Sequence, residues 1–393
     1  MSKGLKIFII LYLTVMLSGC WDKVEINERA FVSAIGFDIY DEKLKKEVEN
    51  NDRGEIEMPQ VSERNRLLVT YVYPNFESIG KNATSKNPRY ILSVTANNGF
   101  QAISTLAART NKVLFFRHAK AVIIGEDTAR DPEILQGIFD SLERHNQLNK
   151  KLILLIAEGT AKEVIETEDR LEPVTGTLLS EIIQKRQSSG RYNTETLQDV
   201  LTAVDYRGRA LIPRVIPGKE ELKLAGSAVI KNSKLIGWLG ELENRAVMFL
   251  LDEIKSETID IKLNNTWIPF IVTDSSTKKT AEVDGDNITI NIEIEMEGYI
   301  QQYKLESEIS FMDDKIIKSI ENEVENLLKK QIDGTLKKLQ KEFKVDVINI
   351  GDYLSKFKPD TWDKVKDSWE EIFPNVEINV SIDAKLRRIG MTK

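Results

Sequence analysis

The feature that most constrains this chain is its N-terminus, an apolar segment that ends at the only cysteine, Cys20. Two lysines precede a nearly unbroken apolar run over residues 7–16, which is too short to serve comfortably as a permanent transmembrane helix. The segment then ends in the small residues that give a bacterial signal peptidase access to the backbone before Cys20. We therefore expect residues 1–19 to be a lipoprotein signal peptide, cleaved between Gly19 and Cys20, and the Cys20 thiol to receive a diacylglyceryl group.

Such a lipid on Cys20 is sufficient to hold a folded body at a membrane. Each buried CH₂ contributes about 0.8 kcal/mol, so two acyl chains anchor a protein firmly where one binds only marginally. No later segment reaches the roughly 18 apolar residues of a membrane-spanning helix, and residues 151–157 are typical of a buried strand instead. The alternatives are an ordinary signal peptide, or a buried start of the first domain with an incidental cysteine.

Composition excludes several classes of protein. With 393 residues, 41% hydrophobic and 30% charged, the chain is long enough for two or three domains with sizeable cores. The net charge is −7, which makes nucleic-acid binding, or broad binding to anionic membranes through the surface, unfavourable. One cysteine and two histidines leave no intramolecular disulfide and remove most zinc sites and most histidine-centred catalysis.

The pattern along the chain predicts an α+β fold, with three mixed α/β domains after the signal peptide. Residues 20–170 alternate strands with helices and form the first domain. Residues 171–222 form a helical middle region, which ends in a Pro- and Gly-rich stretch over 206–219 that we interpret as an inter-domain linker. Residues 223–393 form the last domain.

The longest helical pattern lies in the last domain, at about residues 313–343. Apolar residues line one face, and both signs of charge fill the other, which favours a helix packed on a sheet over one inserted in a membrane. A hairpin over 222–239, a helix over 241–254 and strands over 259–309 precede it. A closing strand over 376–388 follows it.

No constellation of residues for catalysis, cofactor binding or metal binding is present. The chain lacks a glycine-rich phosphate loop, a serine-nucleophile elbow and a His-Glu-x-x-His motif. His118 reads as a structural histidine and His145 as a solvated one, while carboxylate clusters such as Glu166, Glu168 and Asp169 read as an exposed face. We therefore expect a protein that is not an enzyme and that carries no cofactor.

Several stretches, in this order, resemble the Ger(x)C family, the C-subunit lipoproteins of spore germinant receptors. The opening signature comprises Cys20, Trp21, Asp22, Glu25 and the Ile35-Gly36-Phe37-Asp38 run, and Gly226 marks a hairpin in the middle of the chain. The tail supplies the most specific match. Its residues are Asp346, Gly351, Tyr353, Pro359, Trp362, Trp369, Phe373, Pro374, Arg387, Arg388 and Gly390.

The resemblance implies several mixed α/β domains on the outer face of the cytoplasmic (inner spore) membrane. It also implies two integral-membrane partners, an A subunit and a B subunit, with which the protein triggers germination in response to nutrients. The sequence departs from the family at Ile389, where threonine is frequent, and in the charged stretch 41–63, which is longer than usual.

The matched residues also have ordinary interpretations. Trp362 and Trp369 are seven residues apart, so on one helix they would share a face, and a role in the core is more probable than a partner hot spot. Arg387 and Arg388 fit charges at the rim of the surface better than paired groups. Two other functions remain open: a solute-binding lipoprotein with a ligand in an inter-domain cleft, and a cell-wall hydrolase, which is the least favoured.

Overall fold

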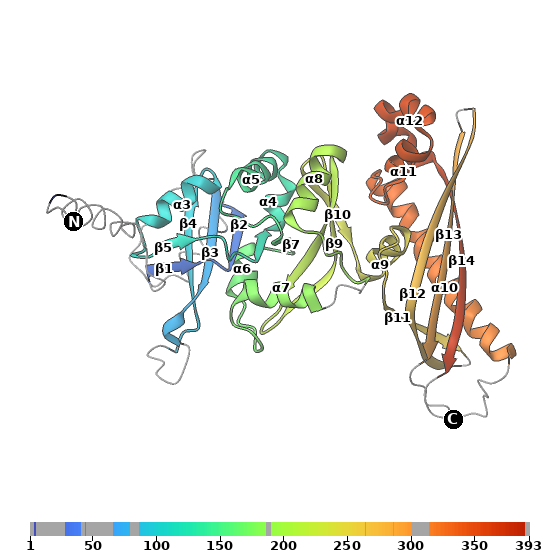
Figure 1. Cartoon of the computed structure of the whole chain (residues 1–393), viewed down its shortest axis with the longest axis horizontal. Helices are drawn as coiled ribbons and strands as arrows, with labels where there is room; N and C mark the ends of the chain where they lie inside the picture. The colour runs from blue at the N-terminus through green and yellow to red at the C-terminus, as the bar shows by residue number, and fades with distance from the viewer. Residues whose placement is uncertain are drawn as a thin grey trace.

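The computed structural model describes residues 28–40, 66–78, 86–185, 190–263, 265–285, 287–300 and 314–389, and the single residues 4 and 44. These residues form an elongated molecule with an eight-stranded sheet toward one end and a four-stranded sheet at the other (Figure 1). Helices and strands are mixed in both parts, so the predicted α+β class is confirmed. The predicted signal peptide and most of the charged stretch 41–63 lie outside the described residues.

The eight-stranded sheet has a parallel centre flanked by antiparallel hairpins. The four central strands are parallel, and their apolar sequences fit burial on both faces. In spatial order the strands are β10 (Lys234–Leu239), β9 (Leu222–Lys231), β8 (Arg209–Pro217), β7 (Ile153–Ala157), β6 (Ala121–Ile124), β2 (Ala34–Ile39), β3 (Leu67–Pro74) and β4 (Arg89–Ala96).

Helices cover both faces of this sheet because side chains alternate along each strand. In β6, Val122 and Ile124 face the core beneath α3 (Gly99–Ala107), α5 (Pro132–Arg144) and α8 (Leu197–Arg207). Their neighbours Ala121 and Ile123 face α6 (Ala161–Glu166) and α7 (Thr175–Lys185). Asp131 caps α5 by accepting hydrogen bonds from the amides of Glu133 and Ile134, and Pro132 occupies the first turn, where its missing N–H costs nothing.

Smaller elements complete this first part of the molecule. A parallel pair of strands, β1 (Arg29–Phe31) and β5 (Val113–Phe115), lies at the end farthest from the four-stranded sheet (Figure 1). The 3₁₀ turn η2 (Phe76–Ser78) follows β3, and the short helix α4 (Glu126–Arg130) follows β6.

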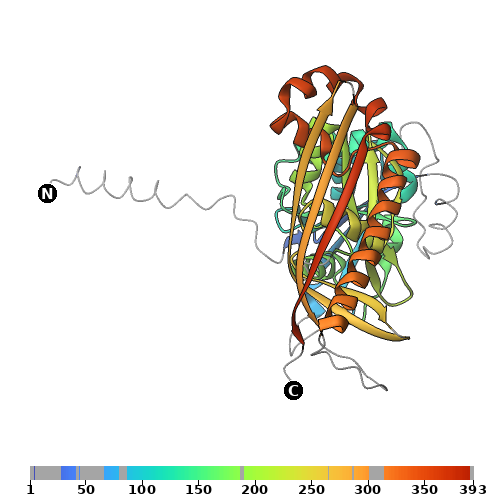
Figure 2. The ribbon, with the colours of Figure 1, turned by 90° about the vertical axis from the view of Figure 1, so that its right-hand side faces the viewer.

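The four-stranded sheet packs against one long helix. Its order is β11 (Glu257–Leu263), β12 (Thr266–Asp284), β13 (Asn287–Ile300) and β14 (Glu377–Ile389). Because β13 and β14 are parallel, the chain must cross over between them, and α10 (Asp314–Lys337) forms most of that crossover. Figure 2 shows α10 running along the sheet beside β14. Ile320, Val324, Leu328 and Ile332 are fully buried there, which confirms the predicted helix-on-sheet packing.

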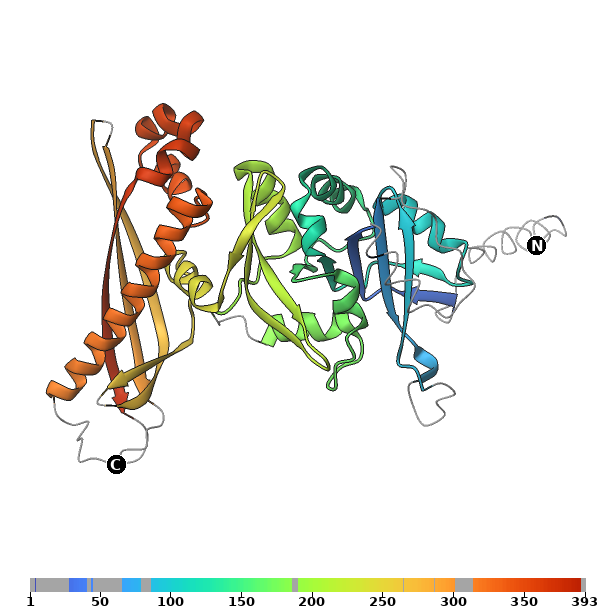
Figure 3. The ribbon, with the colours of Figure 1, turned by 180° about the vertical axis from the view of Figure 1, so that it is seen from behind.

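The end of α10 leads into a group of short helices. The helix continues as a π-helical segment over Lys338–Phe343. It is followed by α11 (Ile350–Phe357), α12 (Pro359–Val365), the 3₁₀ turn η4 (Lys366–Ser368), α13 (Trp369–Ile372) and the 3₁₀ turn η5 (Phe373–Asn375). Figure 3 shows these helices gathered at one end of α10.

The outer edge of β14 is partly closed by the same helix. Glu325 of α10 accepts a hydrogen bond from the Ala384 amide at 3.0 Å, and Glu321 accepts one from the Leu386 amide at 2.9 Å. An edge strand normally leaves such amides unpaired and available to another strand. Here the carboxylates occupy two of them.

The helix α9 (Glu241–Leu250) joins the two sheets into one core. Leu211 and Val229 of the first sheet, Phe249 of α9 and Phe270 of β12 belong to a single buried apolar cluster. Lys338 adds polar contacts across the joint, since its ammonium lies 2.8 Å from Glu243 and 3.0 Å from the Trp238 carbonyl oxygen.

The structure divides the chain differently from the predicted domains. The stretch 206–219 is not a linker, because it contains β8, an interior strand of the first sheet. The hairpin 222–239 extends that same sheet instead of opening the last domain. Proline is tolerated inside β8 because the register with β9 shifts directly after Pro213. The predicted helical middle region contains α7 and α8, and both of them pack on the first sheet.

Within the described ranges, no helix is both long enough and apolar enough to cross a membrane.

Candidate functional site

Three matched residues of the tail, Gly351, Trp362 and Trp369, gather around a fourth, the buried carboxylate of Asp346. Its Oδ1 accepts a hydrogen bond from the Ile350 amide at 2.9 Å, and its Oδ2 accepts from the Gly351 amide at 2.7 Å and from the Trp369 indole at 3.0 Å. The two amides are the first of α11, so the carboxylate lies where the helix dipole favours negative charge.

Arg209 connects this carboxylate to the first sheet. Arg209 is the first residue of β8. Its Nη2 lies 3.4 Å from Asp346 Oδ2, and its Nε donates a hydrogen bond to the Asp346 carbonyl oxygen. Burial raises the pKa of Asp346 above its usual range, whereas the Arg209 guanidinium and the α11 amides oppose that rise. The group therefore pins the short helices of the second part to the sheet of the first.

The two matched tryptophans pack on this carboxylate group but not on a single helix. Trp362 lies in α12 and Trp369 begins α13, so they do not share one helix. The expected role in the core is confirmed, because Trp369 is buried and Trp362 packs against the same apolar cluster. Their rings meet edge-to-face with centroids 5.5 Å apart. A Cβ on Gly351 would lie 2.9 Å from the Trp362 ring and 3.0 Å from the Trp369 nitrogen, so this close packing requires glycine.

A second buried carboxylate, Asp38, ends the opening signature. It accepts hydrogen bonds from the amides of Ala161, at 2.7 Å, and Lys162, at 2.9 Å, at the N-terminus of α6. Burial raises its pKa to about 7 against the opposing effect of these amides. Gly36 lets β2 approach the same helix, since a Cβ there would lie 2.8 Å from the Ile165 side chain. The signature therefore fixes α6 to the sheet.

Gly226 lies at a distortion of β9. Its φ is +76°, and the pairing of β8 with β9 shifts register beside it. A Cβ at this position would lie 2.0 Å from the carbonyl oxygen of Leu239, the last residue of β10. Only glycine fits this conformation and this approach without a shift of the backbone.

Of the remaining matched residues, Ile35, Phe37 and Phe373 are buried in the core, and others lie nearer the surface or outside the described ranges. Arg387 is exposed and pairs with Glu297 at 2.6 Å, contrary to the expectation of an unpaired rim charge. Pro374 lies in η5, where its carbonyl oxygen accepts a hydrogen bond from Lys341. The Arg388 side chain and the residues Cys20, Trp21, Asp22, Glu25 and Gly390 are outside the part of the chain that the structure describes.

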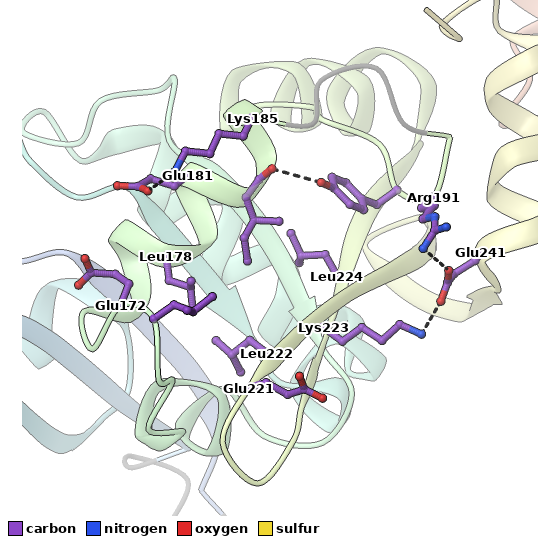
Figure 4. A pocket seen from close by; sticks show the side chains of 13 residues that line it. Glu172, Leu178, Glu181, Lys185, Arg191, Glu221, Leu222, Lys223, Leu224 and Glu241 are labelled. Atoms are coloured by element: carbon purple, nitrogen blue, oxygen red, sulfur yellow. Dashed lines mark hydrogen bonds and ion pairs between the residues drawn. The ribbon is translucent and has the colours of Figure 1, made fainter. Parts of the chain in front are cut away.

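A pocket that no sequence motif indicates opens between α7 and β9 (Figure 4). Its volume is about 640 Å³, with Leu178, Ile182 and Leu224 among its apolar lining residues. Charged groups of both signs surround it, and several pair with one another, as Lys223 does with Glu241 at 2.5 Å. The lining residues come from segments between 171 and 241 with no shared motif, so only the fold brings them together.

The two histidines occupy different surroundings. His145 is half-buried, edge-on to Phe116 with centroids 4.9 Å apart, and burial lowers its pKa, so the prediction of a solvated side chain is wrong. His118 is exposed and stacks on Phe31 at 5.3 Å. Among the described residues, no group of three His, Cys, Asp or Glu side chains is placed to hold a metal ion.

Glu195, just before α8, is an acidic group that sequence reasoning missed. Its Oε2 is buried and has no hydrogen-bond partner among the residues that the structure describes. Burial, together with the charges of Glu253 and Asp199, raises its pKa to about 7. The sequence shows only a carboxylate in a polar stretch, because burial by distant elements cannot be read locally.

This pKa predicts a pH dependence of stability. The folded state binds the Glu195 proton more tightly than the unfolded state does. Protonation of Glu195 therefore adds to the free energy of unfolding in full below about pH 4.5, and this stabilisation is lost as the pH rises through about 7. Glu195→Gln cannot ionise, so we expect it to gain stability relative to the unchanged protein between those values, by up to about 3 kcal/mol. Denaturant unfolding of both proteins at pH 5 and pH 8 measures the difference in their free energies of unfolding. If that difference is the same at both pH values, the raised pKa of Glu195 is contradicted.

The arrangement defines a class of α+β protein in which two sheets share one core and buried signature residues hold the elements together. A solved structure, "Crystal Structure of the GerBC protein", has this fold, with a TM-score of 0.56 and 20% identity over 86% of this chain and 100% of that one. Two family models also match. They are "Spore germination protein N-terminal domain" over residues 22–217 and "Spore germination B3/ GerAC like, C-terminal" over residues 225–390.

The chain therefore belongs to the Ger(x)C family of spore germination proteins, as the sequence predicted. Among its relatives in Bacillus subtilis (strain 168), "Spore germination protein KC" is 25% identical over 99% of this chain and 96% of its own length. "Spore germination protein A3" is 26% identical over 98% of both chains.

Proposed function

We propose that this protein is a lipid-anchored, non-enzymatic subunit of a nutrient germinant receptor. It acts at the outer face of the cytoplasmic (inner spore) membrane through contacts with the integral-membrane A and B subunits. The observation that carries the proposal is the end-to-end match to spore germination proteins, in which both family models align in order along one chain. The lipoprotein motif that ends at Cys20 supplies the anchor.

The packing of the matched residues supports a role by contact. Asp38, Gly226, Asp346 and Trp369 are used inside the fold, where they hold elements together. Buried residues that hold these elements together preserve the shape of the surface that partner subunits would contact. A lipid that confines this surface to the membrane plane raises its effective concentration near integral subunits.

Cys20→Ala tests the anchor. We expect the amount of protein in spore membranes to fall about tenfold or more, because the two acyl chains supply the membrane affinity. The nutrient response should fall with it, and the A and B subunits should no longer co-purify. Ser18→Ala, which keeps a small residue before the cleavage position, is the matched control and should behave as the unchanged protein. A normal nutrient response from a fully released Cys20→Ala protein would contradict the proposal.

A solute-binding role is the second candidate, and the pocket between α7 and β9 is the observation that favours it. Its apolar floor and mixed charges suit a small zwitterion, although the predicted location was a cleft between domains. Saturable binding of a nutrient to the purified protein, abolished when Glu221→Trp fills the pocket, would favour this role.

A further inference from the structure

The net negative charge of the chain conceals a basic segment. Residues 78–125 contain no aspartate or glutamate but include seven lysines and arginines, whereas the whole chain has a net charge of −7. Positive charge is therefore concentrated in one stretch of a protein that is acidic elsewhere. A surface built from this stretch could attract anions that the rest of the molecule repels.

The fold brings part of this segment to one end of the molecule. Arg109 and Lys112 follow α3, Arg117 follows β5, and Arg29 lies on the neighbouring strand β1. In the described part of the chain, none of these four cations forms an ion pair with an acidic side chain. Arg89 is excluded because it is buried against carbonyl oxygens, and Lys120 because Glu181 faces it.

Apolar and aromatic side chains lie among these cations. Phe31 meets Phe76 and Phe115 edge-to-face, with centroids 5.6 and 5.5 Å apart. The Arg29 guanidinium stacks 4.9 Å from the Phe115 ring. Phe76 and Val113 remain 52% and 54% exposed. Exposed aromatic rings beside cations are the combination found on proteins that rest in the headgroup layer of a membrane.

The position of this surface along the chain matches the position of the anchor. Eight peptide steps separate Cys20 from Glu28, and at about 3.5 Å per step they span at most about 28 Å. Strand β1 begins at the next residue, and β1 and β5 lie at the end of the molecule opposite the four-stranded sheet (Figure 1). A lipid on Cys20 therefore keeps this end, and not the other, close to the membrane.

We propose that this basic aromatic end, formed by Arg29, Phe31, Phe76, Lys112, Val113, Phe115 and Arg117, rests directly on an anionic phospholipid surface. The inference rests on the proposed lipid anchor and adds an orientation to it. Glu28 and Glu77 lie next to Arg29 and Phe76 in the chain and limit the positive charge, so the contact needs both the cations and the exposed side chains of Phe76 and Val113. The net charge of −7 disfavours anionic membranes for the chain as a whole, whereas the cations of this end favour them locally.

The test uses the lipidated protein in vesicles, with one introduced cysteine as the unique free thiol. Val113→Cys places an environment-sensitive fluorophore on the basic aromatic end, and Asn287→Cys places it at the far hairpin as a control. On phosphatidylglycerol vesicles we expect the emission of the fluorophore at position 113 to shift to the blue and to be quenched by brominated lipid. The fluorophore at position 287 should show neither effect. Both effects should shrink on phosphatidylcholine, and when ionic strength rises from about 0.01 M to about 1 M, which shortens the Debye length from about 30 Å to about 3 Å.

Charge reversal separates this contact from the anchor. Lys112→Glu combined with Arg117→Glu should abolish the shift at position 113 while the protein stays bound through its lipid. Lys262→Glu combined with Lys278→Glu, an equal change of charge on the second sheet, should leave the shift intact.

Three results would overturn the proposal. Suppose that the fluorophore at position 113 emits as it does in water on both kinds of vesicle, while mass spectrometry shows the lipid on Cys20. The membrane contact would then be wrong, and the proposed lipid-anchored function would be unaffected. A signal that shifts only in membranes containing the A and B subunits would assign this end to a protein partner. An unmodified Cys20 thiol would remove the anchor and the contact together.

Discussion

Asp346→Ala is expected to destabilise the protein by about 3–5 kcal/mol, the usual cost of removing one member of a buried ion pair. The substitution leaves the amides of Ile350 and Gly351 and the Trp369 indole without an acceptor. It also leaves the mostly buried Arg209 with only the more distant carboxylate of Asp352, at 3.7 Å. Each unsatisfied donor costs about 1–3 kcal/mol, although the costs do not simply add. Denaturant unfolding followed by tryptophan fluorescence measures the loss, since Trp369 itself lies in the group.

The matched control is Asp352→Ala. Asp352 contacts Arg207 and Arg209 but is more exposed, so its loss should cost no more than about 1 kcal/mol. Arg209→Ala in the Asp346→Ala background should cost less than Arg209→Ala alone, because the arginine has already lost the nearer and more buried of its two carboxylates. Equal stability of Asp346→Ala and Asp352→Ala would show that the buried carboxylate does not hold the two parts together.

Gly226→Ala is expected to cost about 2–5 kcal/mol, through backbone strain and overpacking together. Alanine disfavours a φ of +76°, and its Cβ would lie 2.0 Å from the Leu239 carbonyl oxygen, an atom of the backbone that no rotamer change can move. The loss should appear as a lower midpoint of thermal unfolding, with faster hydrogen exchange in β9 and β10.

Gly334→Ala is the control for this prediction. It places the same methyl group inside α10, where no neighbouring atom lies within 4 Å of the added Cβ. Alanine is favoured over glycine in a helix, so this variant should be more stable by about 0.5–1 kcal/mol. A Gly226→Ala protein that unfolds at the midpoint of the unchanged protein would contradict the close approach of β9 and β10.

Local patterns in the sequence predicted most of the secondary structure. The Asp131 cap, the apolar stripe of α10 and the buried run of β7 each follow from neighbouring residues alone. The interpretation of residues 206–219 as a linker failed because proline and glycine indicate turns unless a register shift accommodates them, and pairing with β9 is not visible in the segment itself.

The candidate sites were harder to predict because they depend on contacts between distant residues. Resemblance to the family marked Asp346 and Trp369, but the partner Arg209 lies 137 residues away from Asp346 and carries no motif. The burial of Glu195 and the pocket beside α7 likewise arise only when separate segments pack together. The net charge of the whole chain, −7, gives no indication of the basic segment 78–125, which contains no acidic residue.

The two glutamates of α10 that bind the Ala384 and Leu386 amides bear on how copies of this protein can stand together. Bare strand edges invite sheets to fuse from one molecule to the next, which is a route to aggregation in a dense protein layer. With those two amides occupied, this stretch of the β14 edge cannot pair with a strand of a neighbouring molecule, so a contact made here must use side chains and can separate again.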